Sequence, residues 1–126
     1  MDVLLKIDSI MFYVSNLEKA AKFYENELGL KRVWTDKERG MIGFVFAESD
    51  SEIVIHDDVS IPNPSFSFLV ENVEEFCDEY QKRGYAVAQK PFDVRCGKFA
   101  VLVDPDGNEL PIIDLTRFGD EPKYDE

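Results

Sequence analysis

Two stretches in which apolar residues first alternate and then take a helical spacing repeat along the chain. Residues 9–24 read SIMFYVSNLEKAAKFY, and residues 65–80, which start 56 positions later, read SFSFLVENVEEFCDEY. The alternating part predicts a strand, and apolar residues spaced i, i+3 and i+4 after it predict an amphipathic helix. Ser15–Asn16 should open the first helix and Gly29 should end it, while the second should end at Gly84. The repeat indicates two copies of one structural unit.

The helical spacing identifies the residues that each helix should bury. The expected stripes are Leu17, Ala20, Ala21, Tyr24 and Leu28 in the first helix, and Val73, Phe76, Cys77 and Tyr80 in the second. Cys77 is thereby expected to be a small core residue. Cys77 and Cys96 do not have the spacing of a metal-binding pair or of a disulfide framework, so both should be free thiols.

Three short strand candidates follow each helix, and they repeat as well. The predicted strands are residues 31–35, 41–47 and 52–56 in the first copy, and 85–89, 98–103 and 109–113 in the second. The sequence DPDGN at 104–108 has the residues of a tight turn that joins two adjacent strands. The pattern predicts an α+β fold of two βαβββ modules, about residues 5–57 and 64–115, joined by a stiff linker. Together they should form one domain over residues 1–116, followed by a polar surface tail at 117–126.

Composition narrows the range of partners. The chain has 126 residues, of which 44% are hydrophobic, enough for a single core but not for two ordinary domains. Its net charge of -12 opposes binding to nucleic acid or to an anionic membrane and would attract a cationic ligand, although many acidic proteins are simply soluble. No stretch resembles a signal peptide or a membrane span, so a cytoplasmic location is expected.

The opening IxFxVSNLEKAxxFYxxxLG and the closing DPDGN turn resemble the vicinal oxygen chelate superfamily. This group includes glyoxalase I, extradiol dioxygenases, fosfomycin-resistance enzymes and bleomycin-resistance proteins, and the resemblance covers about residues 5–115. It implies that each module curls its sheet, with the helix outside, and that two modules form a cup for a small molecule. It also implies a homodimer, often built by exchange of modules.

Alternation assigns residues to the two faces of these sheets. The helices should cover Ile10, Phe12, Val14, Ile53, Ile55, Phe66, Phe68, Val70, Leu110 and Ile112. The cup should receive Ser9, Met11, Tyr13, Glu52, Val54, His56, Ser65, Ser67, Leu69, Glu109, Pro111 and Ile113.

The four metal-ligand positions of the family fall, by motif, on Ser9, Val54, Ser65 and Pro111. Serine hydroxyls are weak metal donors, and valine and proline side chains donate nothing. The resemblance is therefore nearest to metal-free, bleomycin-resistance-like members, which sequester a cationic or aromatic ligand without a cofactor or catalytic residues. The expected ligand-binding residues are Ser9, Met11, Tyr13, Trp34, Val54, His56, Ser65, Ser67 and Pro111. Trp34 lies in a polar stretch and is expected to serve binding rather than the core.

The alternative is a lyase, isomerase or dioxygenase-type enzyme that uses a displaced metal site. Glu52, His56 and Glu109 share the predicted cup face and could supply two carboxylates and an imidazole. Against this, both glutamates stand beside turns and are expected to be solvated strand ends, and His56 is expected at the surface with a slightly favoured positive charge. A third reading is a regulatory domain whose cup is closed by Met11, Tyr13 and Leu69.

Overall fold

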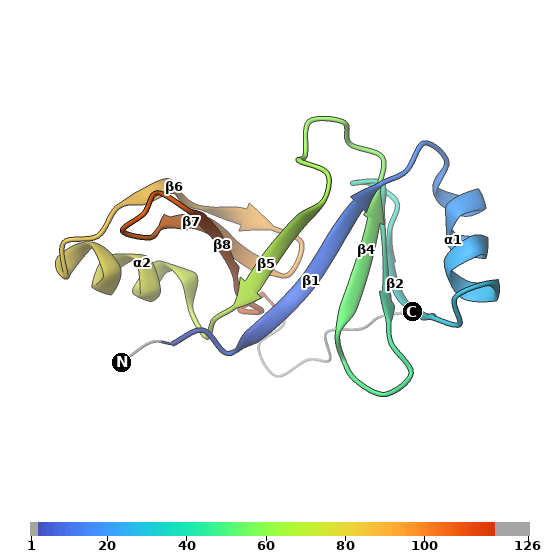
Figure 1. The fold of residues 1–126 in the computed structure, drawn as a ribbon, viewed down its shortest axis with the longest axis horizontal. Coiled ribbons are helices and arrows are strands. Elements are labelled where there is room, and N and C mark those ends of the chain that lie inside the picture. The colour runs from blue at the N-terminus through green and yellow to red at the C-terminus, as the bar shows by residue number, and fades with distance from the viewer. Residues whose placement is uncertain (1–2, 118–126) are drawn as a thin grey trace. The chain divides into compact units, whose positions relative to one another are not determined.

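The computed structural model describes residues 3–117, which divide into two compact units. Residues 9–66 form one unit, and residues 3–8 with 67–117 form the other. The elements of the first module are β1 (Lys6–Tyr13), α1 (Leu17–Asn26), β2 (Lys31–Asp36), β3 (Met41–Val45) and β4 (Glu52–His56). Those of the second are β5 (Ser65–Leu69), α2 (Val73–Lys82), β6 (Val87–Val94), β7 (Gly97–Val103) and β8 (Glu109–Ile113) (Figure 1).

The α+β class and the tandem βαβββ order are confirmed. Membership of both modules in a single domain stays a prediction. The predicted tail lies outside the described residues beyond Arg117. No helix within residues 3–117 is long and apolar enough to cross a membrane.

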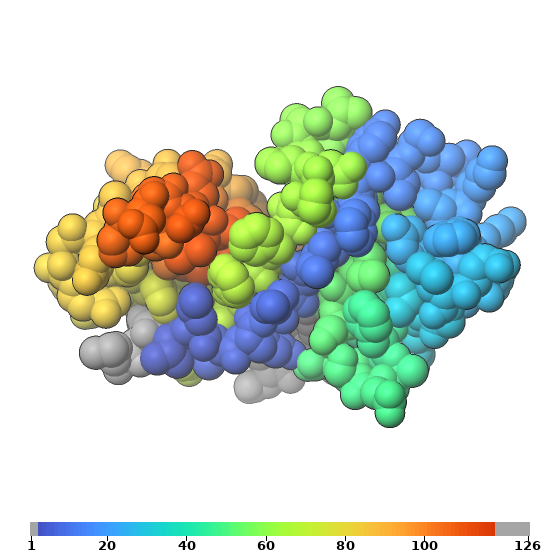
Figure 2. All heavy atoms as spheres, viewed as in Figure 1, coloured from blue at the N-terminus to red at the C-terminus, as the bar shows by residue number. Residues whose placement is uncertain are grey.

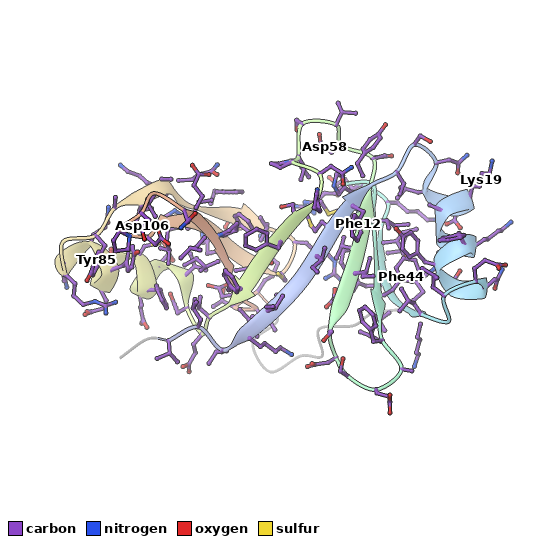
Figure 3. All side chains as sticks on the ribbon, viewed as in Figure 1. Phe12, Lys19, Phe44, Asp58, Tyr85 and Asp106 are labelled. Atoms are coloured by element: carbon purple, nitrogen blue, oxygen red, sulfur yellow. The ribbon has the colours of Figure 1, made fainter. Side chains whose placement is uncertain are left out.

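The sheet of the first module has the strand order β2-β3-β4-β1. β1 runs parallel to β4, with Ser9 opposite Glu52 and Tyr13 opposite His56, and the other neighbours are antiparallel. Helix α1 covers one face of this sheet, where Figure 3 shows the ring of Phe44 between α1 and the strands. The buried residues of this core are Ala21, Leu30, Ile42, Phe44 and Ile55.

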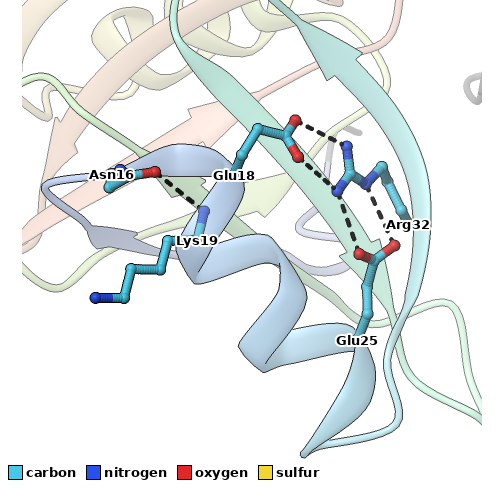
Figure 4. A network of polar contacts seen from close by, with 5 residues as sticks. All are labelled: Asn16, Glu18, Lys19, Glu25 and Arg32. Atoms are coloured by element: carbon cyan, nitrogen blue, oxygen red, sulfur yellow. Dashed lines mark hydrogen bonds and ion pairs between the residues drawn. The ribbon is translucent and has the colours of Figure 1, made fainter.

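Helix α1 is fixed at its start and along its side by polar contacts (Figure 4). Asn16 caps it, because its side-chain oxygen accepts a hydrogen bond of 3.0 Å from the backbone N–H of Lys19. Arg32 of β2 lies 3.3 Å from Glu18 and 3.2 Å from Glu25, so its guanidinium ties the helix to the sheet. The hydrogen bond to Glu18 is the main cause that raises the pKa of Arg32. These ion pairs hold α1 against the sheet on which its apolar stripe packs.

The second module repeats this plan. Its strands are ordered β5-β8-β7-β6, and α2 packs on one face of them through Val73, Phe76 and Cys77. Asn72 caps α2 as Asn16 caps α1, accepting a 3.0 Å hydrogen bond from the N–H of Glu75. Cys77 is a core residue, as predicted, and burial raises the pKa of its thiol.

The predicted turn at 104–108 is confirmed. It joins β7 to β8, with Gly107 at a φ of 88°, in the left-handed region that favours glycine. The carboxylate of Asp104 organises the turn by accepting hydrogen bonds from the backbone N–H groups of Asp106 and Asn108, at 2.9 and 2.8 Å. This is the Asx geometry expected of aspartate in a turn.

Some expected positions are wrong at the edges of the elements. Leu28 is 55% exposed, since α1 ends at Asn26 and the last residue of the stripe falls beyond the helix. Ile10 is 42% and Phe66 is 40% exposed. Neither residue is part of the core that α1 or α2 forms with its sheet. The first strand after α2 begins at Val87 and continues to Val94, later and longer than predicted.

Candidate functional site

The face of the first sheet opposite α1 carries most of the residues expected to bind a ligand. Cross-strand register places three rows on it, with alternate residues of each strand pointing the same way. We call it the helix-free face, and it consists of Ser9, Met11, Tyr13, Trp34, Met41, Gly43, Val45, Glu52, Val54 and His56. The core clusters agree with this assignment for β4, because Ile53 and Ile55 belong to the core with α1 and Val54 belongs to a separate cluster.

The centre of the helix-free face is apolar. Val33, Trp34 and Val54 form a buried cluster, and Met11 packs against it with Met41 and Val45. Trp34 is only 5% exposed, so the expectation that it stands outside the core is wrong. The pairing of β2 with β3 shifts between Arg32 and Trp34, and a bulge of this kind re-aims side chains in a way that strict alternation cannot predict.

Gly43 makes the position of Trp34 possible. The two residues are cross-strand partners, and a Cβ on Gly43 would lie 2.1 Å from Nε1 of the indole. With the ring lying against Gly43, Nε1 donates a 2.8 Å hydrogen bond to Oε1 of Glu52. Glu52 is 4% exposed, which corrects the expectation of a solvated strand end. Sequence reasoning missed Gly43, although a lone glycine within a strand often marks a close approach of this kind.

His56 is fully buried at the end of β4, so the expectation of a charged surface histidine is also wrong. Its Nδ1 accepts a 3.1 Å hydrogen bond from the backbone N–H of Asp58, which Figure 3 shows in the loop after β4. Burial lowers the pKa of His56, and the nearby Asp58 and Asp57 carboxylates oppose that shift in part. The Nε2 atom is buried without a hydrogen-bond partner among residues 3–117, a state that costs about 1–3 kcal/mol.

The lowered pKa of His56 predicts a pH-dependent stability. As pH falls below the ordinary value of 6.5, the unfolded chain takes up a proton that the folded chain resists. The contribution of His56 to the free energy of unfolding should therefore be complete above pH 6.5. It should decrease as pH drops through that value toward the lower pKa of the folded state. Urea unfolding between about pH 7.5 and 5 measures the slope.

The control for this prediction is the variant His56→Phe, which has no imidazole to titrate. Its stability should change less with pH over the same interval, which lies above the usual titration range of carboxylates. Equal slopes for the two proteins would contradict the assignment of this proton to His56.

The second module presents a smaller set of the expected residues on its own sheet. Ser67 is 4% exposed, while Ser65 and Pro111 are half-buried. Pro111 lies opposite Val101 in the pairing of β8 with β7, which gives this part of the sheet an apolar character. Glu109 is exposed, as expected for a residue next to the turn.

Within residues 3–117 the candidate donor atoms are not arranged to hold a metal ion. Glu52 and His56 point to one face of β4 but stand four residues apart, about 13 Å along a strand, so they do not converge on one ion. No group of three His, Cys, Asp or Glu side chains within residues 3–117 is placed to hold a metal. At the motif positions, Ser9 and Ser65 offer neutral hydroxyls and Val54 offers no donor.

Each of the two βαβββ modules thus packs one helix on a four-stranded sheet. Residues 6–112 match the Glyoxalase/Bleomycin resistance protein/Dioxygenase superfamily. The chain belongs to this superfamily, as its sequence motifs predicted. Among curated proteins, no sequence matches it.

Solved structures share the fold at low sequence identity. A Legionella pneumophila structure described as NAD-dependent benzaldehyde dehydrogenase is 24% identical over 85% of this chain and 97% of its own, with a TM-score of 0.62. Methylmalonyl-CoA epimerase from Mycobacterium tuberculosis is 13% identical over 88% of each chain, with a TM-score of 0.64. A Streptomyces coelicolor methylmalonyl-CoA epimerase in complex with 2-nitronate-propionyl-CoA is 14% identical over 89% of this chain and 98% of its own, with a TM-score of 0.61. At these identities the similarity establishes the fold alone.

Proposed function

We propose that the chain is a metal-independent binding protein of this superfamily, which holds a cationic or aromatic small molecule. The observation that carries the proposal is the donor set at the motif positions of the family. Ser9, Val54, Ser65 and Pro111 provide two neutral hydroxyls and two side chains without donors. Such a set can line a binding surface but is a poor set of ligands for a divalent ion.

The helix-free face supports binding of an organic molecule. Its centre is a cluster of Val33, Trp34 and Val54 with methionines beside it, and apolar surface with a few polar groups is typical of ligand sites. The net charge of -12 favours a cation. The proposed binding residues are Ser9, Met11, Tyr13, Trp34, Val54, His56, Ser65, Ser67 and Pro111.

Elemental analysis combined with thermal unfolding tests this proposal. We expect purified protein to contain no stoichiometric Ni, Zn, Mn or Fe, and we expect these ions not to raise its melting temperature. A cationic aromatic compound that binds should raise it by on the order of 10 °C at a hundredfold excess over its Kd. Such a compound should also change the emission of Trp34, the single tryptophan of the chain.

A stoichiometric metal that stabilises the protein and is lost in the variant His56→Ala would contradict metal independence. It would favour instead an enzyme of the lyase, isomerase or dioxygenase type. The matched control is Glu48→Ala, which removes an exposed acid from the turn between β3 and β4 and should leave metal content unchanged.

We also propose that the protein forms a homodimer. An apolar stretch near the N-terminus supports this, since Val3, Leu5 and Ile7 are 56%, 53% and 59% exposed. Figure 2 shows the start of the described chain, in the darkest blue, on the face turned toward the viewer. Exposed apolar residues that follow one another along the chain are characteristic of interaction surfaces. Sedimentation velocity measures the mass in solution, and a monomer at all concentrations would contradict a dimer.

A further inference from the structure

A backbone hydrogen bond fixes which ring nitrogen of His56 carries the proton. The backbone N–H of Asp58 can bond to Nδ1 only if this nitrogen presents its lone pair, so the proton of the neutral ring lies on Nε2. Burial lowers the pKa of His56, which keeps the ring neutral near pH 7. His56 therefore presents Nε2–H as a donor and can accept nothing through that atom.

The donor has no acceptor in the part of the chain that the structure describes. The Nε2 atom is buried and lacks a hydrogen-bond partner among residues 3–117. Buried donors in native proteins are almost always paired, and those not paired with protein groups bond to an internal water or a ligand. An acceptor from outside residues 3–117 is thus needed at this atom.

The neighbours of His56 determine which acceptor suits it. Tyr13 and Met41 are its cross-strand partners, and the ring of Tyr13 lies edge-on with its centroid 6.2 Å away. The charges that act on His56 come from Asp58 and Asp57, and both are negative. A carboxylate ligand would be repelled by them, whereas the oxygen of a neutral amide or ketone would not.

We propose that His56 is a fixed hydrogen-bond donor that recognises the carbonyl oxygen of a neutral group on a flat ligand, packed against Tyr13 and Met41. This inference rests on the proposed function and specifies one end of the ligand. Since no part of His56 is exposed, binding must shift at least one neighbouring side chain.

Three aromatic probes and two observables test the inference. Benzamide carries a neutral carbonyl, benzoate an anionic acceptor, and benzylamine a cation without an acceptor. Because His56 is the only histidine in the chain, its ring nitrogens give unique signals in the NMR spectrum of ¹⁵N-labelled protein. Benzamide should shift the Nε2 signal and protect its proton from exchange with solvent, while benzoate and benzylamine should not. Emission of Trp34 reports independently on binding anywhere along the helix-free face.

Variants separate recognition by His56 from general packing. His56→Phe keeps a ring but removes the donor, and it should weaken benzamide binding about tenfold, the worth of one neutral hydrogen bond, and leave benzylamine binding unchanged. Asp78→Ala changes an exposed residue of α2, away from His56 in the sequence and in the other module, and should leave benzamide affinity within about twofold. If His56→Phe does not fold, the change in the Nε2 NMR signal of the unmodified protein on adding benzamide still tests whether His56 binds the carbonyl.

The outcomes distinguish this inference from the proposed function. If probes change Trp34 emission while the His56 signals stay constant, Nε2 bonds to a fixed internal water and the inference is overturned, but the binding function stands. A stronger response to benzoate than to benzamide would overturn the neutral-carbonyl assignment. If no probe changes either signal, the proposed binding function fails and the inference fails with it.

Discussion

Replacing Asp114 with alanine should lower the free energy of unfolding by about 3–5 kcal/mol, the largest effect expected from a single polar residue of this chain. Asp114 is fully buried just after β8. One carboxylate oxygen accepts a 2.8 Å hydrogen bond from the N–H of Val73, in the first turn of α2. The other accepts from the N–H of Lys98 at 2.8 Å, and from the N–H and hydroxyl of Thr116 at 3.2 and 2.7 Å.

The expected loss of stability follows because the variant Asp114→Ala leaves several hydrogen-bond donors without an acceptor. One carboxylate joins the start of α2, the start of β7 and the chain after β8, and each orphaned buried donor costs about 1–3 kcal/mol. Urea titration measures the effect. Asp78→Ala removes an exposed aspartate of α2 and should change stability by less than about 0.5 kcal/mol. A loss below about 1 kcal/mol in Asp114→Ala would show that water replaces the carboxylate.

The variant Gly43→Ala should displace Trp34 and destabilise the protein by about 2–3 kcal/mol. The added methyl would lie 2.1 and 2.2 Å from Nε1 and Cε2 of the indole, so the ring must move. Its movement breaks the 2.8 Å hydrogen bond to Glu52 and opens the buried cluster. Since the chain has one tryptophan, its emission should shift to longer wavelength as the ring meets water.

A double-mutant cycle tests the cause of this effect. In the background Trp34→Phe the smaller ring leaves room for a methyl group, so Gly43→Ala should cost less there than in the unmodified protein. Thr35→Ala changes the next residue of β2 and should leave the tryptophan emission unchanged. Equal costs of Gly43→Ala in both backgrounds would mean that the strand itself, rather than the indole, requires glycine.

The local elements were predictable because their signals are local. Asn16 and Asn72 cap the helices where the apolar spacing begins, and DPDGN makes the turn between β7 and β8. Period two assigned the faces of β4 correctly, since successive side chains of a regular strand must alternate. The opening of the first module and the DPDGN turn led to the family, and the family match over residues 6–112 confirms it.

The environment of the candidate site was not predictable from the same pattern. Alternation places Glu52 and His56 on one face but does not say what covers them, and both were expected to meet water. Trp34 was expected to stand apart from the core because the residues after it are polar. The register shift between Arg32 and Trp34, with Gly43 leaving space across the strand, buries it instead.

By itself the sequence of this protein determined two βαβββ modules, the faces of β4, and the presence of serine, a weak metal donor, at positions 9 and 65. These follow from interactions between residues near one another in the chain, or from side-chain chemistry alone. Only the tertiary structure decided that Trp34 bonds to Glu52 and that His56 is a buried donor. The reason is that burial and hydrogen-bond pairing depend on contacts between strands, which local periodicity does not specify.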